Sequence, residues 1–242
     1  MRPAAVNFAR VINNEQPNPV PPAPTLSDIL SHPDLREFSI SKLHRLAQLS
    51  RTDMADSIDE FVEDGAEAPN CDLRKVAELD SHQISAPTAR LLRELHGQES
   101  YENELAFRVY HASPAARERL TTRGTRIADL GIQSANIFFV NAENWNGKLS
   151  HPVEAIQKFI FVFDKDVPKK NLSTGFLMDH VAIMPGEILE VSDVDERPDA
   201  TYIMLKGVPM QAEQPVFSPF DGTEYVNFSA KKDYLASFSL HE

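Results

Sequence analysis

The spacing of apolar residues divides the chain into two parts. Between residues 25 and about 100, apolar residues recur three or four positions apart, as they do on one face of a helix. Two such stripes consist of Leu43, Leu46 and Leu49, and of Met54, Ile58 and Val62. Four or five short helices of this kind predict a small helical bundle over residues 25–104.

After residue 104 the pattern becomes that of short strands. Runs rich in β-branched and aromatic residues are separated by Pro, Gly, Asn and Asp. These runs are LAFRVYHA, ANIFFV, KFIFVFDKDV, HVAIMPG, ILEVSDVDE, TYIMLKGV, EYVNFS and YLASFSL. The chain is therefore expected to be an α+β protein, in which a β domain over residues 105–242 follows the helical domain.

One helix is expected between the first two strands. Ser113 is a good N-cap, Pro114 suits the first helical position, and Gly124 suits a helix stop. The segment HPVEAIQKF is consistent with one more short helix. Helices are thus few in this part of the chain.

The first 24 residues form a segment of different composition. They are MRPAAVNFARVINNEQPNPVPPAP, with a proline-rich end and without the long apolar stretch of a Sec signal peptide. We expect residues 1–24 to be a disordered leader. Composition leaves open whether this is a simple tail or a leader that a non-Sec export machine reads.

Charge and cysteine content limit the possible partners. The formal net charge is -12, and an acidic surface repels phosphate backbones, so no nucleic acid partner is expected. Cys71 is the single cysteine, which excludes an internal disulfide and a cysteine-based metal cage. The longest apolar run, FIFVF, is too short to span a bilayer, and we expect no membrane partner.

Several common catalytic motifs are missing. The sequence contains no GxxxxGK[ST] phosphate loop and no HExxH, GxSxG or GxGxxG pattern. This argues against the commonest nucleotide-binding, zinc-hydrolase and serine-hydrolase sites. The acidic segment SDVDERPD lacks the ligand spacing of an EF-hand and is interpreted as a solvated turn.

Three separate segments together resemble a known family. Residues 110–113 read Tyr-His-Ala-Ser, residues 136–140 read Asn-Ile-Phe-Phe-Val, and residues 224–227 read Glu-Tyr-Val-Asn. In order and strand context they resemble the ADP-ribosyltransferase superfamily, in its H-Y-E branch, which is like diphtheria toxin and the poly-ADP-ribose polymerases. The resemblance covers residues 105–242 and none of the helical part.

The chain departs from this family at several positions. Ala112 stands where the family has glycine, and Phe138 stands where it has tyrosine. Gly222 occupies the position two before Glu224, so the Glu/Gln-x-Glu pattern of the arginine-modifying branches is absent. The segment DHVAIMP also resembles the third motif, which makes Asp179 a rival to Glu224.

The resemblance implies a fold, an activity and a set of site residues. The fold would be an ADP-ribosyltransferase-like split β-sandwich after the helical bundle. The activity would be mono-ADP-ribosyl transfer from NAD, used as a substrate, to a protein acceptor, without a metal. Glu224 and His111 would be catalytic. The residues that would bind NAD are His111, Ala112, Ser113, Phe138, Phe139 and Trp145. We expect His111, Phe138 and Glu224 to line one cleft between two mostly antiparallel sheets.

The same layout resembles secreted bacterial effectors that act on host proteins. It implies a monomer that is exported by a non-Sec route into the host cytoplasm, or one that is otherwise cytoplasmic, with a helical part that positions the acceptor protein. Two alternatives remain open: an inactive binding module with the same cleft, and an NAD glycohydrolase that uses water. Single residues also have plainer interpretations: His111 as a core histidine, Glu224 as a solvated strand residue, and Trp145 as a packing residue.

Overall fold

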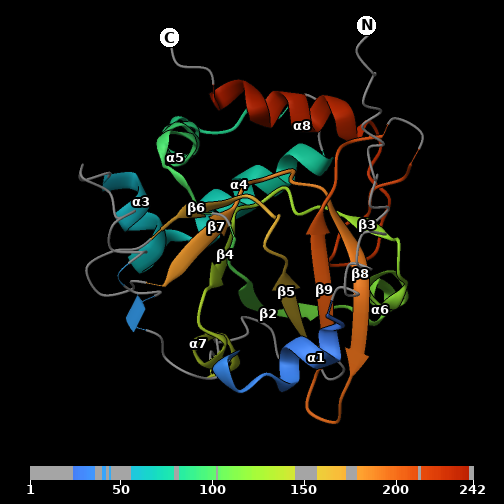
Figure 1. Cartoon of the computed structure of the whole chain (residues 1–242). Helices are drawn as coiled ribbons and strands as arrows, with labels where there is room; N and C mark the ends of the chain where they lie inside the picture. The colour runs from blue at the N-terminus through green and yellow to red at the C-terminus, as the bar shows by residue number, and fades with distance from the viewer. Residues whose placement is uncertain are drawn as a thin grey trace, which may run out of the picture.

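The computed structural model in Figure 1 is built around one large mixed sheet. It describes residues 24–35, 40, 41, 44, 56–78, 82–101, 103–144, 157–172, 179–211 and 214–239. The strands are β1 (Ser100–Tyr101), β2 (Ala106–Ala112), β3 (Arg126–Ile127), β4 (Gln133–Asn136), β5 (Gln157–Phe163), β6 (Lys169–Asn171), β7 (His180–Ile183), β8 (Leu189–Glu196) and β9 (Thr201–Gly207). Among the described residues these nine strands hydrogen-bond in the order β1-β6-β7-β4-β2-β5-β9-β8-β3.

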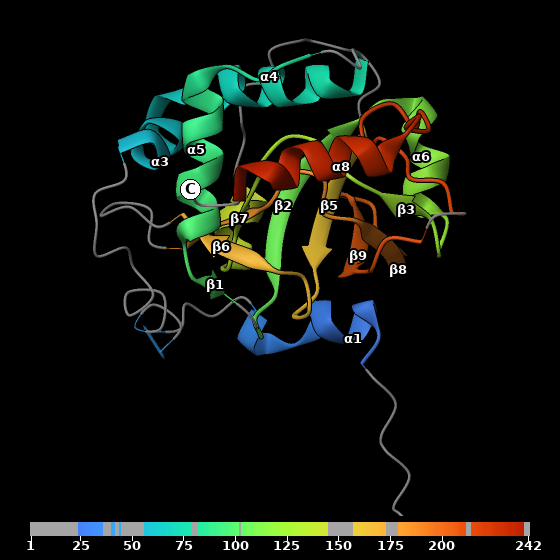
Figure 2. The same cartoon turned by 90° about the horizontal axis from the view of Figure 1, so that it is seen from above.

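Helices lie on both sides of this sheet. They are α1 (Leu26–Ser31), α3 (Asp56–Glu60), α4 (Glu67–Glu78), α5 (Ala86–Gly97), α6 (Pro114–Thr121), α7 (Phe139–Asn144) and α8 (Phe228–Ala236), with the short helices η1 (Pro33–Leu35), η2 (Phe61–Gly65) and η3 (Ser237–Ser239). Figures 1 and 2 show α1 and α8 on opposite sides of β2, β5 and β9. The fold class is therefore α+β, as the sequence predicts.

The sheet is nearly divided between β2 and β4. Strand β2 pairs with β5 over its whole length, from Ala106 to Ala112, but its pairing with β4 is recorded at one position, Phe107 opposite Asn136. All pairings are antiparallel except that of β5 with β9. The expectation of two separate sheets is corrected here, because the strands form one hydrogen-bonded order with a narrow junction.

Most of the predicted strands are present. The apolar runs at 157–163, 180–183, 189–196 and 201–207 are strands, and Ser113 caps α6 by accepting a hydrogen bond from the amide of Ala116, with Pro114 in its first turn. Gly124 adopts a φ of 82°, in the left-handed region that glycine enters without a Cβ clash. Patterns of continuous apolar residues therefore predicted the buried strands correctly.

The C-terminal part is where the strand prediction is wrong. Glu224 forms only an isolated bridge with Phe217, and residues 234–239 of the expected closing strand belong instead to α8 and η3. In α8 the buried residues are Phe228, Lys231 and Leu235, a helical spacing of three and four. The predicted strand ANIFFV is also shorter than expected, because β4 ends at Asn136 and α7 begins at Phe139.

The helices after residue 56 share their core with the sheet. Ile58, Leu73 and Leu92 from α3, α4 and α5 belong to one buried cluster together with Ile132 beside β4 and Ala182 of β7. The proposed stripe Leu43, Leu46 and Leu49 and the residue Met54 lie outside the described residues. The structure does not confirm a separate helical bundle, and the boundary at residue 104 stays a prediction.

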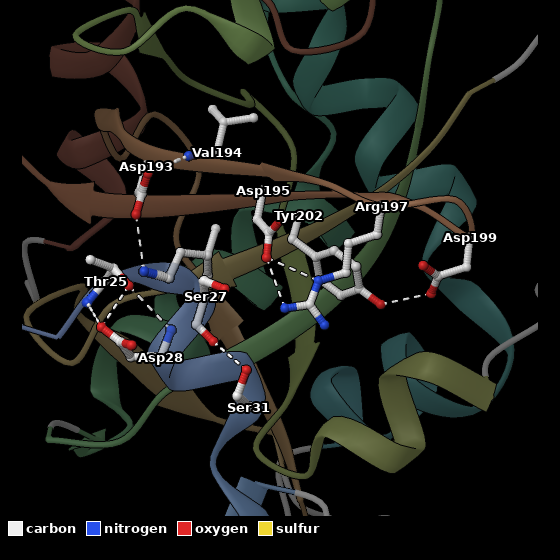
Figure 3. Close-up of polar contacts among 11 residues, drawn as sticks. Thr25, Ser27, Asp28, Ser31, Asp193, Val194, Asp195, Arg197, Asp199 and Tyr202 are labelled. Carbon is white, nitrogen blue, oxygen red and sulfur yellow. Dashed lines mark hydrogen bonds and ion pairs between the residues drawn. The ribbon is translucent and has the colours of Figure 1, made fainter.

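Helix α1 covers one face of the central strands. Leu26 and Leu30 are buried against Ile160 of β5 and Tyr202 of β9 in a common apolar cluster. Thr25 begins the helix with a capping box, in which its hydroxyl and Asp28 exchange hydrogen bonds with each other's backbone amides. The amide of Leu26 donates to the Asp193 carboxylate of β8, 3.0 Å away. Figure 3 shows Thr25 and Asp28 of the capping box beside Asp193.

The attachment of α1 yields the first testable prediction. Leu26 is 1% exposed, so Leu26→Ala removes a fully buried side chain and leaves a cavity between α1 and the sheet. The free energy of unfolding should fall by about 2–5 kcal/mol, measured by urea denaturation. Ser27→Ala, at an exposed position of the same helix, should change it by less than about 0.5 kcal/mol. Equal effects of both variants would contradict the packing described for α1.

Candidate active site

A cavity opens beside the junction of β2 and β4. Its volume is about 260 Å³. Its walls are formed by Phe61, Val62, Ala66, Asn70, Arg108, Val109, Ser134, Asn136, Ala142, Leu172 and His180. The lining thus comes from β2, β4 and β7, from α7 and from the helices η2 and α4, elements that are far apart in the sequence.

Arg108 fills the gap where β2 and β4 separate. Its Nη1 donates to the main-chain oxygen of Ser134, so the guanidinium occupies the place of a strand-to-strand hydrogen bond. Arg108 has intermediate overall exposure, yet its Nε atom is buried without a hydrogen-bond partner within the described part of the chain. Burial lowers the pKa of Arg108, and the nearby charge of Asp129 acts in the opposite direction. The cavity wall therefore carries a half-buried cation with spare donor capacity.

Asn136 and His180 face the cavity from neighbouring strands. The two residues lie directly opposite each other in the β4–β7 ladder, and opposed residues of an antiparallel pair project to the same face. His180 Nδ1 is buried and makes no hydrogen bond to any described residue. Burial lowers the pKa of His180, and the adjacent Asp179 carboxylate partly opposes this shift. The imidazole is therefore neutral near pH 7.

Asp179 lies immediately beside this wall. Its side chain is buried, and its Oδ2 accepts hydrogen bonds from Nδ2 of Asn136 at 3.3 Å and of Asn141 at 2.9 Å. Asp179 is not among the cavity-lining residues, but Asn136 is. The negative charge is thus held next to the cavity, and one neutral amide connects it to the wall.

Helix α4 contributes Asn70 to the cavity wall. Asn70 accepts from the amide of Ile132 at 2.7 Å and donates to its carbonyl oxygen at 3.3 Å, while Arg74 forms an ion pair with buried Asp129. A Cβ at Gly131 would lie 2.9 Å from the Asn70 Oδ1 atom, closer than real Cβ atoms approach. Glycine at this position therefore permits α4 to approach the start of β4.

This architecture is similar to that of solved ADP-ribosyltransferase structures. The ADP-ribosyltransferase Vis, crystallised with agmatine, matches with a TM-score of 0.61 and 13% identity over 80% of this chain and 99% of that one. Another structure of Vis toxin, from Vibrio splendidus, matches with a TM-score of 0.58 and 15% identity over 79% of this chain and 98% of that one. The chain has the ADP-ribosyltransferase fold. No protein-family model matches the sequence, and no curated protein matches it.

Within this ADP-ribosyltransferase fold, His111 lies outside the cavity lining. It is two residues beyond Val109, about 7 Å along the strand, and it pairs with Lys158 of β5. Burial, with a smaller contribution from Lys158, lowers the pKa of His111. Ala112 is buried on the other face, and Ser113 serves as the N-cap of α6.

The predicted aromatic residues have different surroundings. Phe139 is part of the core, with its ring edge against Phe107 at a centroid distance of 5.2 Å, and it packs with Tyr202. Phe138 is 2% exposed and does not line the cavity. Trp145 lies outside the described residues. A role for Phe138 or Trp145 in holding nicotinamide stays a prediction.

Glu224 is not brought together with His111. Glu224 lines a different cavity of about 570 Å³, formed by Met210, Gln211, Gln214, Pro215, Val216, Glu224, Tyr225, Asn227, Phe228 and Ser229. The segment before Glu224 packs on the opposite face of the sheet, since Phe220 lies 4.9 Å from the ring of Tyr110, whose side chain points away from that of His111. The expected common cleft of His111, Phe138 and Glu224 is therefore not found.

Sequence reasoning missed most of the cavity wall. Arg108 and Ser134 were not proposed as site residues, and Asn136 and His180 appeared only inside quoted motifs, whereas Asp179 was noted as the rival carboxylate. One signal was available: Arg108 is the charged residue of an otherwise apolar strand, and such a residue needs a buried partner or a ligand. Asn136 and His180 face each other because β4 and β7 are neighbouring strands. The order of strands in a sheet cannot be read from the residues alone.

The described residues show no site for a metal ion and no membrane span. No group of His, Cys, Asp and Glu side chains among them is arranged to hold a metal ion. Within the same residues, no helix is long and apolar enough to cross a bilayer.

The two partly buried histidines yield a prediction about pH. His180 and His111 have pKa values below the ordinary 6.5 in the folded protein, so the unfolded chain binds more protons once the pH falls below about 6.5. Stability should therefore decrease on acidification through this range. His180→Gln removes one of the two groups, so the dependence of the unfolding midpoint on pH should become weaker. An unchanged or steeper dependence would contradict a neutral, partly buried His180.

Proposed function

We propose that the cavity beside β2 and β4 binds the nicotinamide-ribose end of NAD and that the protein transfers ADP-ribose from it. The observation that carries this proposal is the half-buried guanidinium of Arg108 on the wall of a cavity in an ADP-ribosyltransferase fold. A ligand with anionic oxygens, such as a dinucleotide with its pyrophosphate, would form charge-assisted hydrogen bonds with the guanidinium, which are stronger than hydrogen bonds between neutral groups.

The size of the cavity suits one end of the dinucleotide. Ligand pockets for drug-sized molecules measure roughly 300–1,000 Å³. A volume of about 260 Å³ accommodates a nicotinamide and its ribose rather than the whole molecule. Apolar walls from Val109, Ala142 and Leu172 suit the flat face of the ring, and Ser134 and Asn136 supply polar groups for the ribose hydroxyls and the carboxamide.

The polar groups suit the chemistry of the C–N bond. Breaking the bond between nicotinamide and ribose develops positive charge on the ribose, as in glycoside hydrolysis. The carboxylate of Asp179 lies beside the wall and is connected to it by Asn136, so its negative charge stabilises that developing charge. Glu224 lines another cavity, which favours Asp179 over Glu224 as the carboxylate that acts on this bond.

The acceptor and the biological setting are part of the proposal. Vis is recorded in complex with agmatine, a small-molecule guanidine. We propose that the acceptor of ADP-ribose is a protein. Small molecules are the first probes of acceptor activity. Export by a non-Sec route, action on a host protein, the H-Y-E assignment and a monomeric state remain proposals that rest on the resemblance described above.

Arg108→Met should weaken NAD binding. The substitution removes the half-buried cation and keeps most of the side-chain volume. Losing hydrogen bonds to a charged group costs about 1.5–3 kcal/mol, so the dissociation constant for NAD should rise about 10-fold to 100-fold in isothermal titration calorimetry. Arg117→Met is the matched control, because Arg117 lies on the surface, with half of its side chain exposed and paired to Glu196. Equal NAD affinity in both variants would refute the assigned cavity.

Asp179→Asn should lower turnover more than Glu224→Gln. The asparagine keeps the size of the side chain but removes the negative charge, so nicotinamide release should slow by roughly 100-fold while NAD affinity changes little. Glu224→Gln should leave the rate within about 2-fold, since its cavity is separate. A loss in Glu224→Gln together with full activity in Asp179→Asn would show that Glu224 is the carboxylate after all. Nicotinamide released with and without an acceptor would separate transfer from hydrolysis.

A further inference from the structure

We infer that His180 is the general base of this site and that the acceptor it serves is a neutral hydroxyl, either water or an alcohol group, rather than a guanidinium. This inference rests on the proposed function and names the class of acceptor for the same cavity. It follows from the charges on the wall, the position of His180 and the bonding of Asp179.

The charges on the cavity wall disfavour a cationic acceptor. Arg108 is the permanent cation, and no carboxylate belongs to the lining within the described residues. The one carboxylate nearby, Asp179, already accepts from the amides of Asn136 and Asn141. A guanidinium acceptor would lose its water shell beside Arg108 without a counter-charge on the wall, which is strongly unfavourable. A neutral nucleophile avoids this cost.

A hydroxyl nucleophile must lose its proton as it reacts, and the imidazole of His180 is the basic group on the described wall that can accept it. The hydroxyl oxygen forms a bond to the ribose carbon. The bond from that carbon to nicotinamide breaks, and its electron pair goes to the ring nitrogen, which becomes neutral. The hydroxyl proton moves to the imidazole of His180 and then to solvent. NAD and the hydroxyl compound thus give nicotinamide, the ADP-ribosylated product and one proton.

The surroundings of His180 keep it in the proton-accepting form. Asp179, from the turn before β7, is the charged group that acts on it, and Arg108 of β2 lines the same cavity. The other described wall residues around the cavity, among them Leu172 after β6 and Asn70 of α4, are uncharged. The Nδ1 atom of His180 has no hydrogen-bond partner among the described residues, so no acceptor at Nδ1 stabilises the protonated ring. The adjacent Asp179 stabilises the imidazolium when it forms during the reaction.

The inference is tested with His180→Gln and His180→Ala, with His32→Gln as the control at an exposed position of the α1 C-cap. NAD binding is measured by calorimetry and nicotinamide release by chromatography, on the full-length protein. His180→Gln should bind NAD within about 3-fold of the parent and release nicotinamide about 100-fold more slowly. The parent rate should fall on acidification below neutral pH, and His180→Gln should lose this dependence. Added imidazole should restore activity to His180→Ala, in which the side-chain volume is vacant.

Three acceptor conditions identify the hydroxyl. Nicotinamide release is compared in buffer alone, with a serine-containing peptide and with agmatine. Formation of the peptide adduct identifies an alcohol and supports both the inference and the proposed transfer. Release in buffer alone identifies water, which supports the role of His180 but replaces the proposed transfer with hydrolysis. An agmatine adduct formed at the same rate by the parent and by His180→Gln would overturn it while leaving the proposed function intact. Absence of NAD binding by the parent protein would overturn both.

Discussion

The site depends on one interaction, the hydrogen bond from the Arg108 guanidinium to the main-chain oxygen of Ser134. Strands β2 and β4 pair at Phe107 and Asn136, and the side chain of Arg108 bonds to β4 close to that point. The Ser134 carbonyl oxygen, which a backbone amide of β2 would otherwise bond, accepts a hydrogen bond from the Arg108 side chain instead. Strands β2 and β4 can therefore separate without leaving this oxygen unpaired. The separation creates the cavity, and the same guanidinium gives it a positive wall.

The other parts of the site support this junction. Helix α4 is held against the start of β4 through Asn70 and through the ion pair of Arg74 with buried Asp129. Opposition of Asn136 and His180 across β4 and β7 places an amide and an imidazole side by side. Asp179 is positioned by the amides of Asn136 and Asn141, so its charge is fixed before a ligand arrives. This is preorganisation: the groups that would meet developing charge need no rearrangement.

The sequence predicted the class of fold and most of the strands, because continuous apolar runs such as FIFVF suit strands buried on both faces. It failed where local pattern and tertiary packing disagree. The end of the chain alternates like a strand, yet Phe228, Lys231 and Leu235 are buried at helical spacing in α8. The candidate site was harder to predict. The resemblance selected residues by their order along the chain, whereas membership of the cavity depends on which strands are neighbours. Asp179 was recognised as a rival acid from its motif, but His180 beside it was not.

The most direct test of the account is a crystal structure of the protein with NAD. The account predicts that the nicotinamide and its ribose occupy the cavity between Arg108 and His180, with an anionic oxygen of the dinucleotide bonded to the Arg108 guanidinium and the Asp179 carboxylate behind Asn136. NAD bound instead in the cavity that Glu224 lines would contradict it.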